Sequence, residues 1–311
     1  MGLAVDVDLA LKQHEAYVEA LCAAVGQVVT LSPLPEHPDA VFVEDTAVFC
    51  GDRAALCVPG HESRQGEVPS IARALAGMGV GIACPASAPG EGHVTVCSAS
   101  HEDASDRAGL DALQDTACSS TLASGRAAGV CVDGGDVLNL GRELLVGVSS
   151  RTSRGGVTYL HSVFHGMLPV SGVDLRQLHS AHGSLHLKSL LSVVGEVGVA
   201  ALQQVLEAST VYGEAVPVLA GATLNAVLAG SADQKRTLFV VPVPDWEAAN
   251  AVFANGTLII KCASEAPRSA AVFEAYARAA GSQLGVSQVL QVATSEVSKV
   301  DGALTCCSIL L

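Results

Sequence analysis

The chain has 311 residues, and 50% of them are hydrophobic although only 4% are aromatic. Its formal net charge of −14 argues against nucleic acid or an anionic membrane surface as a partner. The length is sufficient for one large domain or two small ones, with a core built mainly from Val, Leu and Ala.

The ten cysteines show no metal-binding pattern. No Cys-x-x-Cys pair occurs, and no spacing of Cys and His resembles a zinc site. The N-terminal residues are not typical of a signal peptide, and the longest uncharged run, 215–232, contains Pro217 and Asn225 and suits a membrane span poorly. We therefore expect a cytoplasmic protein with reduced thiols, no metal and no membrane partner.

Apolar periodicity and turn residues predict pairs of strands that alternate with single helices. Helices are predicted at 6–25, 65–76, 156–165, 198–207 and 266–280. Strands are predicted at 28–31, 41–49, 54–58, 80–84, 129–132, 137–140, 143–148 and 168–173, on both sides of residue 186, at 238–243, in a hairpin at 251–260, and from 306 onward. Gly51-Asp52 and Asn255-Gly256 are typical hairpin turns. The fold class that follows is α/β.

Residues 85–129 differ in composition from the rest of the chain. They are rich in Ala, Ser, Gly and Asp and contain few large apolar groups. Such a segment buries little surface and rarely orders itself. We expect an inserted surface excursion with one short helix near 108–115; a small independent domain is the alternative.

A pair of thiols, Cys306 and Cys307, follows a polar loop close to the C-terminus. A thiol nucleophile needs a mobile loop that faces the substrate, and a nearby positive charge or base that favours the thiolate. Cys306 is the candidate nucleophile, and Cys307 is expected to point to the opposite face of a terminal strand and to pack there. A buried structural thiol is the alternative for Cys306.

His186 and Asp133 are candidates for proton transfer and for its orientation. The near-neutral pKa of histidine suits a general acid and base, but His179 and His182 lie nearby and composition alone does not choose among them. Asp133 begins the sequence Asp-Gly-Gly-Asp136, in which glycines permit close backbone approach. The alternatives are a structural histidine and an ordinary acidic turn, and Asp136 is expected to be structural.

Five further charged residues are candidates for binding a small molecule. The carboxylates of Asp39, Glu44 and Asp45 are suited to a planar guanidinium, and Glu44-Asp45 is a costly placement inside an apolar strand. Arg64 and Arg151 are suited to a carboxylate group, which arginine binds bidentately. Either arginine could instead be an ordinary surface residue.

Four motifs in this order resemble the dimethylarginine dimethylaminohydrolases, which are cysteine hydrolases of the guanidine-modifying (pentein) superfamily. The motifs are Val41-Phe-Val-Glu44-Asp45-Thr46, Asp133-Gly-Gly-Asp136, Leu185-His186-Leu-Lys188-Ser189 and Leu304-Thr-Cys306-Cys307-Ser308. The resemblance covers residues 6–311 except 85–129. It implies a single domain, 1–311, folded as an α/β propeller of five ββαβ modules with its active site in the central channel. Family members begin with a strand and a flexible loop that precede the first helix of this chain, so one module is expected to lack a strand.

The resemblance also implies roles for individual residues. The first Cys of the last motif, Cys306, corresponds to the nucleophile, His186 to the acid and base, and Asp133 to the carboxylate paired with the histidine. The substrate-binding residues that it implies are Asp39 and Asp45 for the guanidinium, Glu44 in the lining, Arg64 and Arg151 for the carboxylate, Val300 and Asp301 near the α-amino end, and Ser189.

The implied activity is hydrolysis of N-ω-methylated arginine to citrulline and an amine through a covalent cysteine adduct, without metal or organic cofactor. The expected partner is the small-molecule substrate, and the protein is expected to be a monomer or homodimer. An arginine deiminase is the alternative enzyme. A non-catalytic propeller that binds a guanidino ligand or a protein partner is the other alternative, because part of the substrate lid is expected to be missing.

Overall fold

The computed structural model of the chain describes residues 4–85, 107–176, 185–196, 198–202, 239–245, 248–280 and 285–311. The chain divides into two compact units. Unit 1 contains Met1–Thr30 and Gln177–Thr305, and unit 2 contains Leu31–Arg176 and Cys306–Leu311. The single domain 1–311 stays a prediction.

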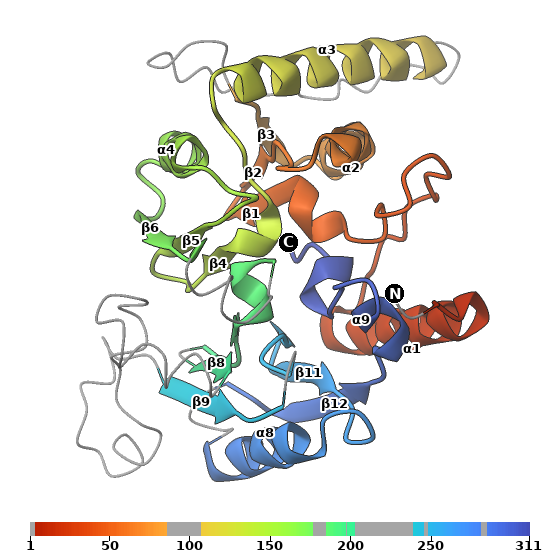
Figure 1. The fold of residues 1–311 in the computed structure, drawn as a ribbon, viewed down its shortest axis with the longest axis vertical. Helices are drawn as coiled ribbons and strands as arrows, with labels where there is room; N and C mark the ends of the chain where they lie inside the picture. Colours follow the sequence, from red (N-terminus) through yellow and green to blue (C-terminus); the bar gives the residue numbers. More distant parts are fainter. Residues whose placement is uncertain are drawn as a thin grey trace. The chain divides into compact units, whose positions relative to one another are not determined.

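Unit 2 contains two three-stranded sheets of the same ββαβ order (Figure 1). In each, two antiparallel strands are followed by a helix and by a third strand that runs parallel to the second. The first module is β1 (Ala47–Cys50), β2 (Arg53–Leu56), α2 (Val68–Gly77) and β3 (Gly81–Ala83). The second is β4 (Val137–Asn139), β5 (Leu144–Val148), α4 (Arg154–Val163) and β6 (Val170–Asp174). The predicted turn at Gly51-Asp52 is confirmed.

The core of unit 2 joins these two modules. All five residues of β5 are buried, as expected for a central strand between two neighbours. The phenol oxygen of Tyr159, on α4, lies 3.0 Å from the carbonyl oxygens of both Leu56 and Ala83, so α4 is tied to the first sheet as well as to its own. Burial of the whole ring stabilises the unit, by about 2 kcal/mol or more.

Unit 1 contains the other two described sheets, which have the same strand order. One comprises β7 (Leu191–Val193), β8 (Gly198–Leu202) and β9 (Phe239–Val243). The other comprises β10 (Val252–Ala254), β11 (Thr257–Lys261), α8 (Pro267–Ala280) and β12 (Gln288–Val292). Asn255 and Gly256 both have positive φ, 46° and 79°, which confirms the predicted two-residue hairpin turn. The α/β class is therefore confirmed, with four three-stranded sheets of the same strand order in the described residues; the fivefold propeller arrangement stays a prediction.

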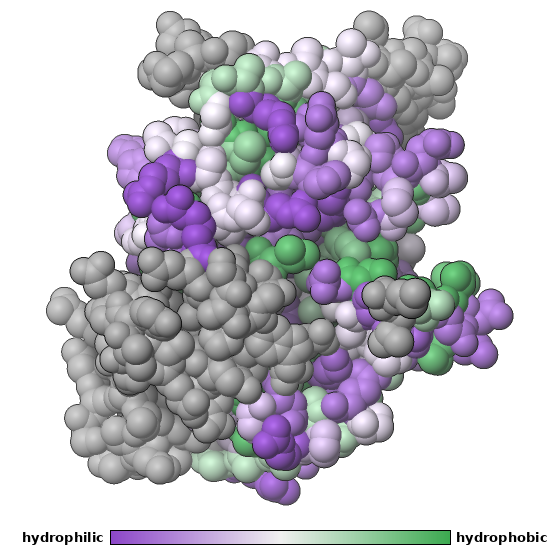
Figure 2. Space-filling view, viewed as in Figure 1, coloured by the Kyte–Doolittle hydropathy of each residue, from purple (hydrophilic) through white to green (hydrophobic). Residues whose placement is uncertain are grey.

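Helix α1 (Val7–Val25) begins and ends as the sequence predicts. The Asp6 carboxylate accepts a hydrogen bond from the Leu9 amide, and Gly26 ends the helix with φ 79°. Gln13 attaches α1 to the short helix α9 (Ser295–Ser298) through hydrogen bonds to Ser295 Oγ and the Glu296 amide. The first turns of α1 expose large apolar side chains, and Figure 2 shows apolar residues there among polar ones.

Four predicted elements are wrong. Residues 198–202, predicted to begin a helix, form β8, because pairing with β7 on one side and β9 on the other outweighs the helical propensity of Ala and Leu. Residues 28–31, 129–132 and 308–311 form no strand. Around 129–132 the backbone makes single hydrogen bonds, from Val132 to Val58 and from Ser153 to Cys131, rather than a continuous ladder.

The inserted segment is more ordered than its composition predicts. Residues 107–127 form the 21-residue helix α3 in place of a short helix at 108–115. Leu122 on α3 is 1% exposed and packs in the cluster that contains Val58, and the Arg126 guanidinium donates to the carbonyl oxygens of Pro59 and Gly60. Leu122, the partly buried Cys118 and Arg126 thus join α3 to the core. Residues 86–106 lie outside the described residues.

In the part of the chain that the structure describes, no helix has both the length and the apolar character needed to cross a membrane.

Candidate functional site

Two carboxylate-bearing turns of unit 2 interlock. They are η1 (Val43–Thr46), which carries Asp45, and η3 (Gly134–Asp136). The Gly135 amide donates to Asp45 Oδ1 at 2.9 Å, and a Cβ on Gly134 would lie 1.9 Å from the carbonyl oxygen of Glu44. The predicted role of the glycines in close backbone approach is therefore confirmed.

The local structure of η1 corrects the predicted strand 41–49. The strand begins only at Ala47, because Thr46 Oγ1 donates to the Val43 carbonyl at 2.6 Å and closes a tight helical turn. Glu44 and Asp45 are therefore not on opposite faces of a strand, and both are buried, at 6% and 2% exposure. Two buried carboxylates in one turn are costly unless they are hydrogen-bonded.

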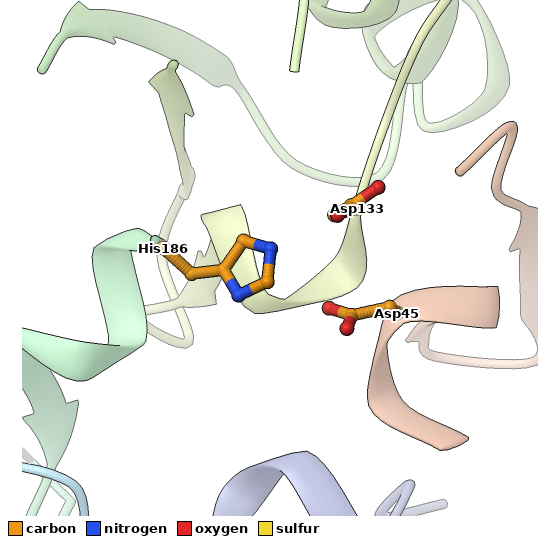
Figure 3. Close-up of side chains that lie close together, drawn as sticks. All are labelled: Asp45, Asp133 and His186. Carbon is orange, nitrogen blue, oxygen red and sulfur yellow. The ribbon is translucent and has the colours of Figure 1, made fainter. Parts of the chain in front are cut away.

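Asp133 lies immediately before η3 and is 1% exposed. Its Oδ1 accepts a hydrogen bond from the Gly60 amide at 2.7 Å, and its own amide donates to Thr152 Oγ1 at 3.1 Å. A carboxylate oxygen of Asp133 lies within 4.8 Å of one of Asp45 (Figure 3). Unit 2 thus brings together two carboxylates from the predicted site.

Asp136 has the structural role that the sequence predicts. It is fully buried, and its Oδ2 accepts a hydrogen bond from Ser149 Oγ at 2.6 Å. Ser149 Oγ in turn accepts from the amides of Arg151 and Thr152 at 2.9 and 3.0 Å. Asp136 thereby fixes the turn that carries Arg151. Among the described residues, the Arg151 guanidinium has no ion-pair partner.

Arg64 lies in a different environment from Arg151. It is 6% exposed, and its guanidinium donates to Asp45 Oδ2 at 2.5 Å, to both oxygens of Glu67, and to the carbonyl oxygens of Asp39 and Phe42. Burial lowers the pKa of Arg64, but the hydrogen bonds and charges of Glu67 and Asp45 outweigh it and hold the pKa above its ordinary value. In this structure Arg64 therefore supports the carboxylates of unit 2 rather than presenting an open guanidinium.

Asp39 accepts a hydrogen bond from Arg64 through its backbone, not through its side chain. Its carbonyl oxygen accepts from Arg64 Nη2 at 3.2 Å, whereas the residue itself is exposed. Burial raises the pKa of Glu67, against the lowering effect of Arg64, and the nearby charge of Asp39 raises it further. An exposed carboxylate in this position is accessible to a cationic ligand.

His186 and Ser189 lie in unit 1, at the two ends of one turn. His186 precedes η4 (Leu187–Ser189), and the Ser189 amide donates to the His186 carbonyl at 3.2 Å. Leu187 and Leu190 are fully buried and anchor the turn. The structure thus holds the backbone of His186 firmly in its unit.

Val300 and Asp301 follow α9 in unit 1. The Val300 side chain is 48% exposed, and Asp301 adopts the left-handed conformation with φ 60°. The Gly302 amide donates to the Val297 carbonyl at 2.9 Å, which closes the turn and leaves the two residues at its surface.

Cys306 and Cys307 belong to the short turn η7 (Thr305–Cys307), which corrects the predicted terminal strand. Both thiols are half-buried. Desolvation and the nearby carboxylates of Glu44 and Asp45 raise the pKa of Cys307 to about 12. Cys307 therefore remains a neutral thiol near pH 7. The prediction that it packs on the opposite face of a strand is wrong, because residues 305–307 form a turn.

Three polar residues of these networks were missed by sequence reasoning: Glu67, Thr152 and Asn250. All are at most 2% exposed and all are hydrogen-bonded to a predicted site residue or to its turn. Asn250 stands in an apolar run, which is a signal for a buried polar group, but the sequence does not show its partners. Within either unit alone, the described His, Cys, Asp and Glu side chains form no group of three suited to a metal ion.

The sequence of the chain matches known proteins. A sequence model described as arginine deiminase matches residues 124–223. The N(G),N(G)-dimethylarginine dimethylaminohydrolase of Streptomyces coelicolor is 28% identical, over 99% of this chain and 88% of that protein. The protein of the same name from Pseudomonas aeruginosa is 26% identical, over 98% of this chain and 89% of that protein. Over nearly its whole length, the chain is therefore similar in sequence to the dimethylarginine dimethylaminohydrolases.

Solved structures extend the agreement to the fold. A dimethylarginine dimethylaminohydrolase mutant from Pseudomonas aeruginosa, complexed with citrulline, matches with a TM-score of 0.63 at 22% identity, over 98% of this chain and 92% of that one. The substrate-bound N-terminal domain of ArgZ, a cyanobacterial arginine dihydrolase, matches with a TM-score of 0.62 at 16% identity, over 98% and 87%. Together with the sequence relatives, these matches support a hydrolase that modifies guanidino groups.

Proposed function

We propose that the protein hydrolyses N-ω-methylated arginine, namely asymmetric dimethylarginine or monomethylarginine, to citrulline and dimethylamine or methylamine. The observation that carries the proposal is the buried pair of carboxylates, Asp45 and Asp133, whose oxygens lie within 4.8 Å of each other. Two carboxylates at this distance repel each other unless a cation or hydrogen-bond donors lie between or around them. A guanidinium supplies both the positive charge and a planar set of donors.

Binding of the substrate is divided among three groups of residues. The proposed guanidinium ligands are Asp45 and Asp39, with Glu44 in the lining. Arg151 is the proposed partner of the substrate carboxylate, since its guanidinium has no ion pair among the described residues. Arg64, proposed by resemblance for the same role, can take it only if it gives up part of its contacts with Asp45 and Glu67. Val300, Asp301 and Ser189 are the proposed contacts at the α-amino end.

The proposed reaction has two steps. The Cys306 thiolate attacks the guanidinium carbon, a C–S bond forms, and the C–N bond to dimethylamine breaks as His186 gives its proton to the leaving nitrogen. His186, now neutral, removes a proton from water, whose oxygen attacks the same carbon. The C–S bond then breaks, which releases citrulline and restores the thiolate. Asp133 is proposed to orient His186 and to stabilise its protonated form, and no metal or organic cofactor takes part.

The proposed location is the cytoplasm. A reducing compartment keeps cysteine side chains in the thiol form. A cysteine hydrolase also needs its nucleophile in the reduced form.

The substrate class is tested by product analysis on three compounds: asymmetric dimethylarginine, monomethylarginine and arginine. The proposal expects citrulline from the methylated compounds, together with dimethylamine or methylamine, at a higher kcat/KM than from arginine. Citrulline and ammonia from arginine alone would favour the deiminase, an alternative that the arginine deiminase match supports. Ligand-induced thermal stabilisation without any turnover would favour the binding-only alternative.

A further inference from the structure

Asn250 occupies a buried position beside two of the proposed catalytic segments. It is 2% exposed and lies just before β10 in unit 1. Its Oδ1 accepts a hydrogen bond from the Thr305 amide at 2.9 Å, and its Nδ2 donates to Thr305 Oγ1 at 2.9 Å and to the Lys188 carbonyl oxygen at 3.0 Å.

These three hydrogen bonds define the orientation of the amide group. The Thr305 N–H requires an acceptor and the Lys188 carbonyl requires a donor, so oxygen and nitrogen cannot be exchanged. Both hydrogens of Nδ2 are used. Aspartate or leucine, although similar in size, could not satisfy all three partners.

The backbone of Asn250 is also held on both sides. Ser192 Oγ, on β7, donates to the Ala249 carbonyl oxygen at 2.5 Å and accepts from the Ala251 amide at 3.0 Å. Ser192 is 1% exposed. Asn250 therefore projects from a backbone that is fixed to a sheet, which is the support that a positioning group needs.

The partners of Asn250 adjoin the proposed nucleophile and acid. Thr305 precedes Cys306 directly in the chain, and Lys188 lies two residues after His186 in the turn that His186 begins. One side chain thus joins the residue that leads into Cys306 to the turn that carries His186. Displacement of a reacting group by about 1 Å can cost about 100-fold in rate.

We propose that Asn250 is a positioning residue that fixes the backbone before Cys306 and the turn of His186 relative to each other. The inference rests on the proposed function for its catalytic meaning, but not for its effect on the reactivity of the Cys306 thiol. Asn250 is not proposed to touch substrate.

The test compares Asn250→Ala, Thr305→Val and Thr305→Ser with the wild-type chain. The alanine removes all three hydrogen bonds, the valine removes only the Thr305 hydroxyl, and the serine retains it. With asymmetric dimethylarginine, Asn250→Ala is expected to lower kcat about 100-fold with little change in KM. Thr305→Val is expected to show a smaller loss, and Thr305→Ser to keep wild-type kcat.

A second readout does not depend on turnover. The rate of alkylation of Cys306 by iodoacetamide is measured by peptide mass spectrometry relative to the exposed thiol of Cys22. Asn250→Ala is expected to change this ratio at pH 7, because loss of the hydrogen bonds to Thr305 releases the backbone next to Cys306 and alters the access of the reagent to its thiol. If the wild-type chain turns over no guanidino compound, the proposed function fails and the alkylation ratio alone decides the role of Asn250.

Ser269→Ala is the matched control. Ser269 is fully buried in the same unit, and its hydroxyl accepts a hydrogen bond from the Asp245 amide, away from Thr305 and Lys188. It is expected to lower the melting temperature while keeping kcat and the alkylation ratio. The proposal would be overturned if folded Asn250→Ala kept both the kcat and the alkylation ratio of the wild-type chain. It would also be overturned if Ser269→Ala changed both quantities as much as Asn250→Ala does.

Discussion

Arg64 and Asp45 form a buried ion pair with 2.5 Å between Nη1 and Oδ2. The other oxygen of Asp45 accepts a hydrogen bond from the Gly135 amide, so both carboxylate oxygens are held from fixed directions. A carboxylate fixed in this way is prepared to meet a planar cation without reorganising. The ion pair therefore contributes to the packing of unit 2 and also orients a carboxylate that is proposed to bind the substrate.

Loss of the Arg64 guanidinium is expected to destabilise unit 2 strongly. Arg64→Ala leaves the buried Glu67 and Asp45 carboxylates without their partner, which typically costs about 3–5 kcal/mol in the free energy of unfolding. Chemical denaturation measures this change. Arg73→Ala is the control, because Arg73 pairs with Asp115 in a partly exposed position and its loss is expected to cost less than about 1 kcal/mol. Similar effects of the two substitutions would contradict the account.

The close approach of η1 and η3 predicts that Gly134 tolerates no side chain. Gly134→Ala places a Cβ 1.9 Å from the Glu44 carbonyl oxygen, so the two turns must separate and Asp45 must move away from Asp133. We expect a drop in kcat of about 100-fold or more together with a lower melting temperature. Gly77→Ala is the matched control. Its Cβ meets nothing within 4 Å, and alanine is the better residue near the end of a helix, so stability is expected to stay equal or rise.

The adjacent thiols of Cys306 and Cys307 are expected to differ in how their rates of alkylation depend on pH. Because the pKa of Cys307 is raised to about 12, its alkylation is expected to stay slow through neutral pH and to increase only in strongly alkaline solution. Cys306 is expected to react first, and peptide mass spectrometry distinguishes the two. The unfolded thiol titrates near 9.0, so the stability that comes from neutral Cys307 is present below pH 9 and is lost as the pH rises toward 12. Faster alkylation of Cys307 than of Cys306 at pH 7 would contradict the assignment of Cys306 as the nucleophile.

Arg151 is expected to act on the carboxylate end of the substrate alone. Arg151→Ala should raise KM for asymmetric dimethylarginine about 10-fold or more, with a smaller effect on kcat. The same substitution should not alter the kinetics of an analogue that lacks the α-carboxylate. Arg154→Ala provides the control, since its side chain is 80% exposed and lies 3.7 Å from Asp174. An equal rise in KM for asymmetric dimethylarginine and for the analogue would show that Arg151 acts on the fold instead.

Much of the fold could be predicted from local signals. The hairpin turns at Gly51 and Asn255-Gly256 and the caps of α1 depend on the conformational needs of single residues, and each is confirmed. The strand β8 could not be predicted, because its partners β7 and β9 decide its conformation and β9 is distant in the sequence. The length of α3 was missed because its tertiary contacts, which include the burial of Leu122 and the hydrogen bonds of Arg126, cannot be read from a polar composition.

The candidate site was predictable as a set of residues but not as a set of contacts. The motifs single out Asp45 and Asp133, and the structure places a carboxylate oxygen of each within 4.8 Å of the other, whereas the roles of the two residues stay predictions. They gave no indication that Arg64 is already paired with Asp45 and Glu67, because an ion pair depends on tertiary placement and not on spacing. Asn250 was missed for the same reason, since the two residues that it contacts, Thr305 and Lys188, lie 55 and 62 positions away in the sequence.

The central claim is tested most directly by citrulline formation from asymmetric dimethylarginine, with the wild-type chain and Cys306→Ser measured side by side. The account predicts citrulline and dimethylamine in equal amounts from the wild-type chain and no turnover from the serine variant, with both proteins folded. Equal turnover by the two proteins would contradict the assignment of Cys306, and no turnover by a folded wild-type chain would contradict the proposed activity.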